Sequence, residues 1–272
     1  MIEAFQFEFM RNALLAGLLA SIACGMIGTL VVVNRIVFIS GGIAHAAYGG
    51  VGLAVFFNFS PLVGAGGFSL IISLLMAAVT IRNKQRADTI IGVLWAVGMA
   101  LGIILIDLTS GYKVDLMSYL FGSILTVSTF DVLLTVAVDI AVIGVISFFY
   151  NDFLALSFDE EFALAVGVPI RLLYFLLLAM IAVSVVMVIR VVGLILVIAL
   201  LTIPPYIAEL YCGSLRSMMV FSILLSCLFT LMGLWISYTY NLTSGATIIM
   251  VAAVCFFLAL LVDHLAHRWG RR

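Results

Sequence analysis

The chain has 272 residues, of which 66% are hydrophobic and only 9% are charged, with a formal net charge of −1. A soluble domain of this length would carry about 25% charged residues, so the composition excludes a globule in water and indicates an all-α polytopic membrane protein. The net charge argues against a nucleic-acid partner, and the apolar runs are continuous rather than alternating, which excludes a transmembrane β-barrel.

Nine apolar runs are long enough to cross the hydrocarbon core, which requires about 20 residues. We expect about nine membrane-spanning helices, within a range of eight to ten, in a single transmembrane domain over residues 1–272. The segment 112–129 is shorter, amphipathic and interrupted by Gly and Ser, so we expect an outer-face or re-entrant helix there. The predicted spans are 12–33, 38–57, 62–81, 89–106, 131–150, 172–189, 191–211, 217–238 and 244–264.

The positions of Lys and Arg predict the orientation of the chain, because these residues concentrate in cytoplasmic segments. If the loop at 82–88 is cytoplasmic and the spans alternate from there, cytoplasmic segments hold nine of the twelve Lys and Arg residues. The outer segments hold Arg11, Lys113 and Arg190. The sequence therefore predicts that the N-terminus lies outside and the C-terminus in the cytoplasm, which agrees with an odd number of spans.

The longest polar interruption of the second half, residues 151–171, is cytoplasmic in this orientation. Phe158, Phe162 and Val166 follow an i, i+4, i+8 spacing, which predicts one short amphipathic helix that ends at Gly167. It is either an ordinary loop helix or a helix that docks on a cytoplasmic partner. No GxxxxGK[ST] nucleotide-binding motif is present, so energy for uphill transport would come through such a partner.

His45 is the only histidine outside the C-terminal tail, and it lies in the glycine-rich apolar segment 39–54. An ionisable imidazole about 10 Å inside the membrane is costly unless something satisfies or uses it. Two interpretations stay open: a hydrogen bond between helices, or a transient metal ligand. We expect Gly41, Gly49 and Gly50 to let another helix approach closely.

Three other polar or helix-breaking features lie in predicted spans. Asp139, in the middle of the fifth span, is either a carboxylate that helps His45 to bind metal or a neutral acid in a structural hydrogen bond. Glu209, at the inner end of the seventh span, marks either a metal exit or an interfacial anchor. Pro204 and Pro205 should break the seventh helix and form either a gating hinge or a static kink.

Three sequence blocks carry a resemblance to a known family. They are VVNRIVFISGGIAHAAYGGVGLA at 32–54, FDEEFALAVGVP at 158–169, and VVGLILVIALLTIPPYIAEL at 191–210 followed by SLRSMM at 214–219. LMSYLFGSIL at 116–125 is similar to the family as well. With these blocks in the family's order, the chain resembles the permease subunit of ATP-binding-cassette importers for divalent transition metals, the ABC-3 family, along nearly its whole length.

The resemblance implies a type II-like importer permease of the bacterial plasma membrane, with no ATPase activity of its own. Its implied partners are a second copy of the chain, two cytoplasmic ATPase subunits that use ATP, and an extracytoplasmic metal-binding protein. No cofactor would be bound permanently, since zinc, manganese or iron is the cargo. The family's coupling helix corresponds to about 152–169. The implied ATPase-coupling residues are Phe158, Asp159, Glu160, Phe162, Ala163 and Gly167.

One departure from the family concerns the metal. In the family an acidic residue usually stands four positions before the histidine, which places two ligands on one helix face, but here that position is Gly41. An imidazole suits zinc, whereas the missing carboxylate disfavours the harder manganese, so zinc is the first expectation and manganese or iron the next. The alternative class is an ion-coupled secondary transporter, with Asp139 as its lone intramembrane acid. The inverted repeats typical of such transporters are not visible in the sequence.

Overall fold

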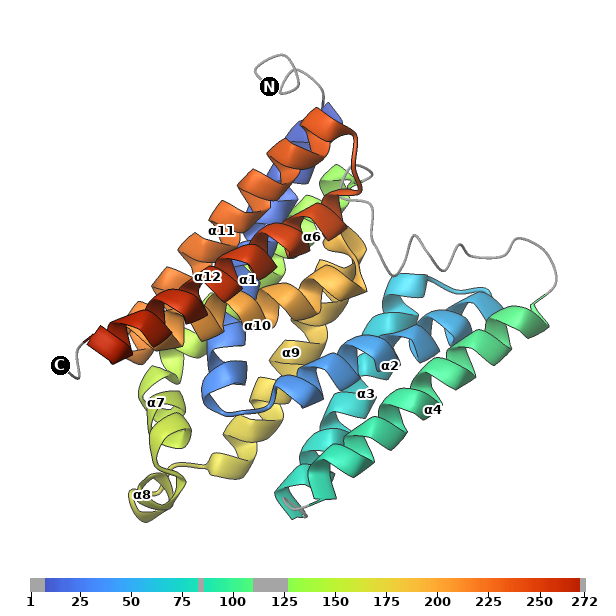
Figure 1. The fold of residues 1–272 in the computed structure, drawn as a ribbon. Helices are drawn as coiled ribbons and strands as arrows, with labels where there is room; N and C mark the ends of the chain where they lie inside the picture. Colours follow the sequence, from blue (N-terminus) through green and yellow to red (C-terminus); the bar gives the residue numbers. More distant parts are fainter. Residues whose placement is uncertain (1–7, 83–85, 110–126, 270–272) are drawn as a thin grey trace.

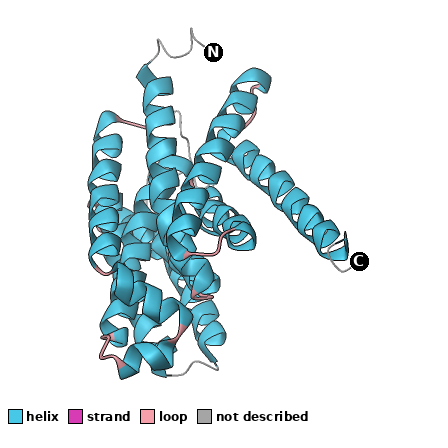
Figure 2. Ribbon diagram, turned by 90° about the vertical axis from the view of Figure 1, so that its left-hand side faces the viewer, coloured by secondary structure: helices cyan, strands magenta, loops and turns pink. Residues whose placement is uncertain are grey.

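The computed structural model describes residues 8–82, 86–109 and 127–269, and every regular element in this part of the chain is a helix (Figures 1 and 2). Nine of the described helices are long and apolar enough to cross a membrane, which confirms the nine predicted spans. The helix expected at 112–129 falls almost wholly outside the described residues. The nine helices are α1 (Glu8–Val33), α2 (Val37–Phe56), α3 (Pro61–Arg82), α4 (Ala87–Leu108), α6 (Thr129–Phe148), α9 (Ile170–Val192), α10 (Leu194–Tyr211), α11 (Leu215–Tyr240) and α12 (Ser244–Trp269).

The nine helices pack as two groups with α9 between them. One group consists of α2, α3 and α4, and the other is built around α1, which contacts α6, α10 and α11 (Figure 1). Helix α9 packs against α2 and α3 on one side and against α1, α6 and α10 on the other. Helix α12 packs on α10 and α11 and extends away from the rest of the bundle (Figure 2).

Glycines on α2 bring its backbone into contact with the backbones of α3 and α4. A Cβ atom on Gly49 would lie 2.7 Å from the carbonyl oxygen of Gly98 on α4, and one on Gly50 would overlap the carbonyl group of Gly64 on α3. Only glycine leaves room for two helix backbones at this separation. Gly41 differs, because a Cβ there would meet no atom within 4 Å, so the close packing predicted for Gly41 is not found within this chain.

Helix α10 continues through Pro204 and Pro205, so the predicted break in this helix is wrong. Pro205 has no N–H group, which leaves the carbonyl oxygen of Leu201 without its donor inside the helix. That oxygen faces Gly28 on α1, where a Cβ would lie 2.7 Å from it. Close packing against α1 holds α10 on a helical path. A gating role for the two prolines stays a prediction.

The connector between α6 and α9 is two helices rather than the one predicted. Helix α7 (Tyr150–Phe158) ends where Asp159 takes an extended conformation with φ −151° and ψ 96°, and α8 (Glu160–Ala165) begins immediately after it. The Asp159 carboxylate accepts a hydrogen bond of 2.9 Å from the backbone N–H of Phe162. This is the N-cap arrangement that aspartate favours, and it separates the two helices. The predicted stop at Gly167 is confirmed, since its φ of +84° suits glycine.

The glycine contacts generate a stability prediction. We expect Gly50→Ala to destabilise the protein by about 1–3 kcal/mol, because the new methyl group overlaps the backbone of α3 and forces the two helices apart. Gly41→Ala is the matched control on the same helix, and we expect it to leave stability nearly unchanged. Thermal unfolding of both purified variants in detergent measures the difference. Equal losses at the two positions would contradict the packing described for α2.

Candidate functional site

The imidazole of His45 is held in one orientation between α2 and α4. Its Nδ1 lies 2.9 Å from the carbonyl oxygen of Gly41, one turn earlier on α2. Since a carbonyl oxygen only accepts, Nδ1 carries the proton and Nε2 of the neutral ring keeps its lone pair. Metal-ligating histidines commonly donate their other N–H group in this way. The bond stays inside α2, so it is not the interhelical hydrogen bond of the structural interpretation.

Trp95 of α4 forms the other wall of the site, and the sequence alone did not single it out. Its ring stacks on that of His45 with centroids 4.1 Å apart and an interplanar angle of 31°. The indole N–H donates to the sulfur of Met99 at 3.1 Å, which fixes the tryptophan in turn. A depth count could have found the pair, because α2 and α4 begin at the same end of the bundle and each ring stands eight residues into its helix.

Asp139 does not meet His45. Its side chain is 3% exposed on the face of α6 that packs against α1 and α9, whereas α2 packs against α3, α4 and α9. Neither carboxylate oxygen has a hydrogen-bond partner among the described residues, so the structural hydrogen bond is absent as well. Because the carboxyl group is enclosed within its own bundle, it does not supply the acid that His45 lacks.

Other acidic residues also lie away from His45. Glu209 is exposed near the end of α10, and the neighbouring Tyr211 donates a hydrogen bond of 3.2 Å to the carbonyl oxygen of Ala259 on α12. Asp131, at the start of α6, forms an ion pair of 2.7 Å with Arg190 of α9. In the part of the chain that the structure describes, no three His, Cys, Asp or Glu side chains gather into a metal-binding group.

At the opposite end of α9, the connector helices α7 and α8 present apolar side chains to solvent. Phe158, Phe162 and Leu164 are each more than half exposed, whereas Ala163 is fully buried and anchors the helix. The amide of Asn34, at the end of α1, donates a hydrogen bond of 2.9 Å to the hydroxyl of Ser157, which connects α7 to the bundle. The connector is thus fixed on one side and apolar on the other, which suits a surface that another protein covers.

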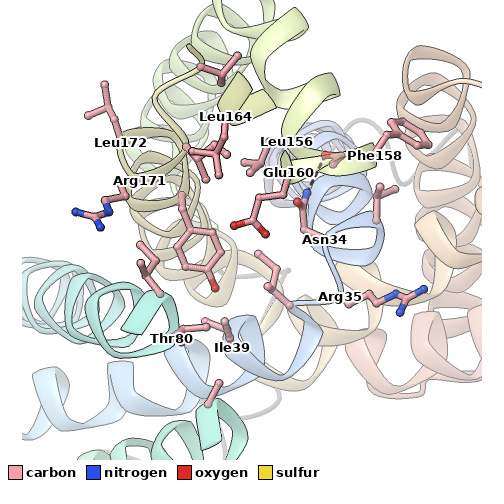
Figure 3. A pocket seen from close by; sticks show the side chains of 18 of the residues that line it. Asn34, Arg35, Ile39, Thr80, Leu156, Phe158, Glu160, Leu164, Arg171 and Leu172 are labelled. Carbon is pink, nitrogen blue, oxygen red and sulfur yellow. Dashed lines mark hydrogen bonds between the residues drawn. The ribbon is translucent and has the colours of Figure 1, made fainter. Parts of the chain in front are cut away.

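A cavity of about 1090 Å³ lies beside this connector, at the end of the bundle where several arginines collect (Figure 3). It is bounded by the α1–α2 turn, the adjoining ends of α3, α4 and α9, and the connector helices. Glu160 and Asn34 line it from one side and Thr80 from the other, with Arg35 and Arg171 at its edges (Figure 3). These charged residues place the cavity at the predicted cytoplasmic side of the bundle.

Sequence and structure comparisons identify the family. A sequence profile of the ABC 3 transport family matches residues 6–263, which is nearly the whole chain. The chain belongs to this family. An uncharacterized membrane protein of Synechocystis is 52% identical over 260 residues, and the match covers 96% of this chain and 92% of that protein. The manganese transport system membrane protein of Listeria monocytogenes is 32% identical over 256 residues, covering 94% and 91% of the two chains.

A solved relative has the same fold. The PsaBC complex from Streptococcus pneumoniae, determined with a Fab, contains a chain that superposes with a TM-score of 0.85 at 32% identity, covering 95% of this chain and 93% of that one. This ABC-3 protein is therefore a multi-pass membrane permease of a bacterial divalent metal importer of the ABC type, and a transport subunit rather than an ATPase. Its class implies separate ATPase and binding-protein partners, and membership of the family removes the secondary-transporter alternative.

The enclosure of Asp139 generates a second prediction. We expect Asp139→Asn to leave metal uptake intact and to keep or raise the thermal stability, because the change removes an ionisable group that has no buried partner. Asp131→Asn, on the same helix, is the control. It breaks the ion pair with the partly exposed Arg190 and should lower stability by up to about 1 kcal/mol.

Uptake into proteoliposomes and thermal unfolding in detergent are measured for both variants. Loss of uptake by a well-folded Asp139→Asn protein would place Asp139 in the metal pathway after all.

Proposed function

We propose that this ABC-3 permease imports zinc, that it works as a homodimer, and that His45 is a transient ligand for the metal as it crosses. Manganese and iron are the other ions to be compared. An ATPase subunit would drive the cycle by pushing on the α7–α8 connector, and an extracytoplasmic protein would deliver the metal. A permanently bound cofactor has no part in this scheme.

The geometry of His45 is the observation that carries the proposal. Its ring is oriented by the hydrogen bond to Gly41 and by stacking on Trp95. The hydrogen bond keeps the proton on Nδ1 and leaves the Nε2 lone pair free, which is the tautomer that binds a metal through Nε2. A single imidazole binds transition metals weakly, which favours passage over trapping. In a two-fold symmetric dimer, the second copy would supply a second imidazole by symmetry.

The preference for zinc rests on the absence of carboxylates from α2. The helix contains no Asp or Glu, and the position one turn before His45 is Gly41. Carboxylate ligands suit manganese, whereas imidazole suits zinc, so the chemistry of this helix favours zinc. Several relatives are named as manganese transport proteins, which makes the comparison of the two ions the deciding measurement.

Metal uptake by proteoliposomes that contain the permease, its ATPase and loaded binding protein tests the role of His45. We expect His45→Ala to reduce uptake of zinc at least tenfold while ATP hydrolysis persists, because the transient ligand is lost and the coupling surface is untouched. Trp95→Phe, which keeps an aromatic ring against the imidazole, is the control and should retain uptake. If His45→Ala transports zinc as well as the wild type, the histidine is structural.

Gly41→Asp separates zinc from manganese in the same assay. The new side chain has room, since a Cβ at this position meets no atom within 4 Å. It adds a carboxylate one turn from the imidazole, so we expect manganese uptake to rise relative to zinc uptake. A wild-type protein that already prefers manganese would contradict the zinc assignment but not the role of His45.

The coupling surface yields a separate prediction. We expect Phe162→Asp to weaken co-purification of the ATPase subunit at least tenfold, because a charge replaces an exposed apolar side chain at the centre of the α8 surface. Leu242→Asp, at an equally exposed position between α11 and α12, is the matched control. Equal binding of the ATPase by the wild type and Phe162→Asp would show that α8 is an ordinary loop helix.

A further inference from the structure

A second hollow of the molecule lies away from His45, between α1, α6, α7 and α11. It is a groove of about 680 Å³ on the helix group that does not include α2–α4. We call it the α6–α11 groove. This volume is in the range of pockets that hold small organic ligands. None of the residues discussed for metal passage lines it.

The groove is polar at one end and apolar along the rest. Arg216, the second residue of α11, lies at the polar end with Tyr150 and Asn151, the first two residues of α7. Seven residues deeper along each wall stand Ile223 of α11 and Ile143 of α6. At 1.5 Å per residue the apolar wall therefore reaches about 10 Å into the bilayer from the polar end.

The polar end carries a positive charge that forms no ion pair within the described part of the chain. Arg216 is exposed, and no acidic side chain in the described ranges 8–82, 86–109 and 127–269 forms an ion pair with it. It stands at the arginine-rich end of the bundle, which the distribution of Lys and Arg places at the cytoplasmic leaflet. That leaflet contains anionic lipids, and basic pockets between membrane helices on this side bind their head groups.

We propose that the α6–α11 groove binds one anionic phospholipid of the cytoplasmic leaflet. The lipid phosphate lies at the Arg216 guanidinium, which offers the planar set of donors that phosphate accepts. The Tyr150 hydroxyl and the Asn151 amide are the further polar groups at this level. One acyl chain lies along Ile143 and Ile223, where its contact with the protein replaces contact with bulk lipid.

The bound lipid would contact both the connector and the membrane-spanning helices. The polar end includes the first residues of α7, which is the first helix of the connector. The apolar wall belongs to α6, α11 and α1. The site is therefore placed to stabilise the α6–α7 junction. Binding of the lipid does not depend on which metal is transported or on the role of His45.

Native mass spectrometry of the full-length detergent-purified protein tests the proposal. Phosphatidylglycerol and phosphatidylcholine with identical acyl chains are titrated separately, and the first bound lipid is quantified. We expect the wild type to bind phosphatidylglycerol more tightly than phosphatidylcholine, and Arg216→Ala to lose about fivefold in phosphatidylglycerol affinity, as for one interfacial cation. Arg216→Lys should keep most of the binding.

Two further variants test the site of the charge and the apolar wall separately. Arg171→Ala removes an exposed arginine from the same end of the bundle but from a different cavity, so it should bind phosphatidylglycerol like the wild type. Ile143→Trp fills the apolar wall from an exposed position, and it should weaken binding of either lipid while the protein remains folded and monodisperse.

The proposal is overturned if Arg216→Ala binds phosphatidylglycerol like the wild type, if the two lipids bind equally, or if Arg171→Ala causes the same loss as Arg216→Ala. It is also overturned if Ile143→Trp abolishes self-association of the protein without changing lipid binding, because a second copy would then occupy the groove.

Discussion

The backbone contact of α2 with α3 and α4 is the constraint on which the candidate site depends. Within a bilayer, helices associate through packing rather than through exclusion of water, so the distance of closest approach decides which side chains meet. Gly49 and Gly50 make that distance as short as two backbones allow. On the α4 side, where Gly49 meets Gly98, Trp95 of α4 stacks directly on His45 of α2. The close approach of the two helices and the stacking of the two rings thus occur along the same interface.

The two helix groups separate different polar chemistries. The group with α2, α3 and α4 holds His45 against an aromatic wall, whereas the group around α1 encloses Asp139 with no hydrogen-bond partner among the described residues. A buried carboxyl group without donors is expensive in either protonation state, which is why polar residues at this depth usually occur in pairs. The separation leaves α2 with the imidazole nitrogen of His45 as its only strong ligand type. This preference for nitrogen ligands follows both from the sequence of α2, which has no acidic residue, and from its neighbouring helices, which do not bring Asp139 to His45.

The sequence predicted the parts of the structure that depend on length and composition, and failed where neighbours decide the outcome. Nine spans were predictable because each must match the thickness of the hydrocarbon core. The sequence left a pairing of Asp139 with His45 open as one of two interpretations, because hydrophobic periodicity says nothing about which helices are adjacent. The continuity of α10 through Pro204 and Pro205 was missed for a related reason, since α10 packs at Leu201 and Pro205 against Gly28 on a distant segment. Conversely, the stacking of Trp95 on His45 was accessible from their equal depth, had the two helices been known to be neighbours.

The N-cap at Asp159 has a mechanical consequence for the connector. A hydrophobic pattern that runs on through this residue suggested one rigid rod, but the extended backbone at Asp159 is a joint between two short arms. The two arms therefore point in different directions and are joined by a single residue. On the other side, α8 is followed by Gly167 and then by Pro169, whose ring restricts the backbone at the entry to α9. Helix α9 lies between the two helix groups, so a displacement of α8 that reaches α9 would act on the α1 group and on the α2 group together.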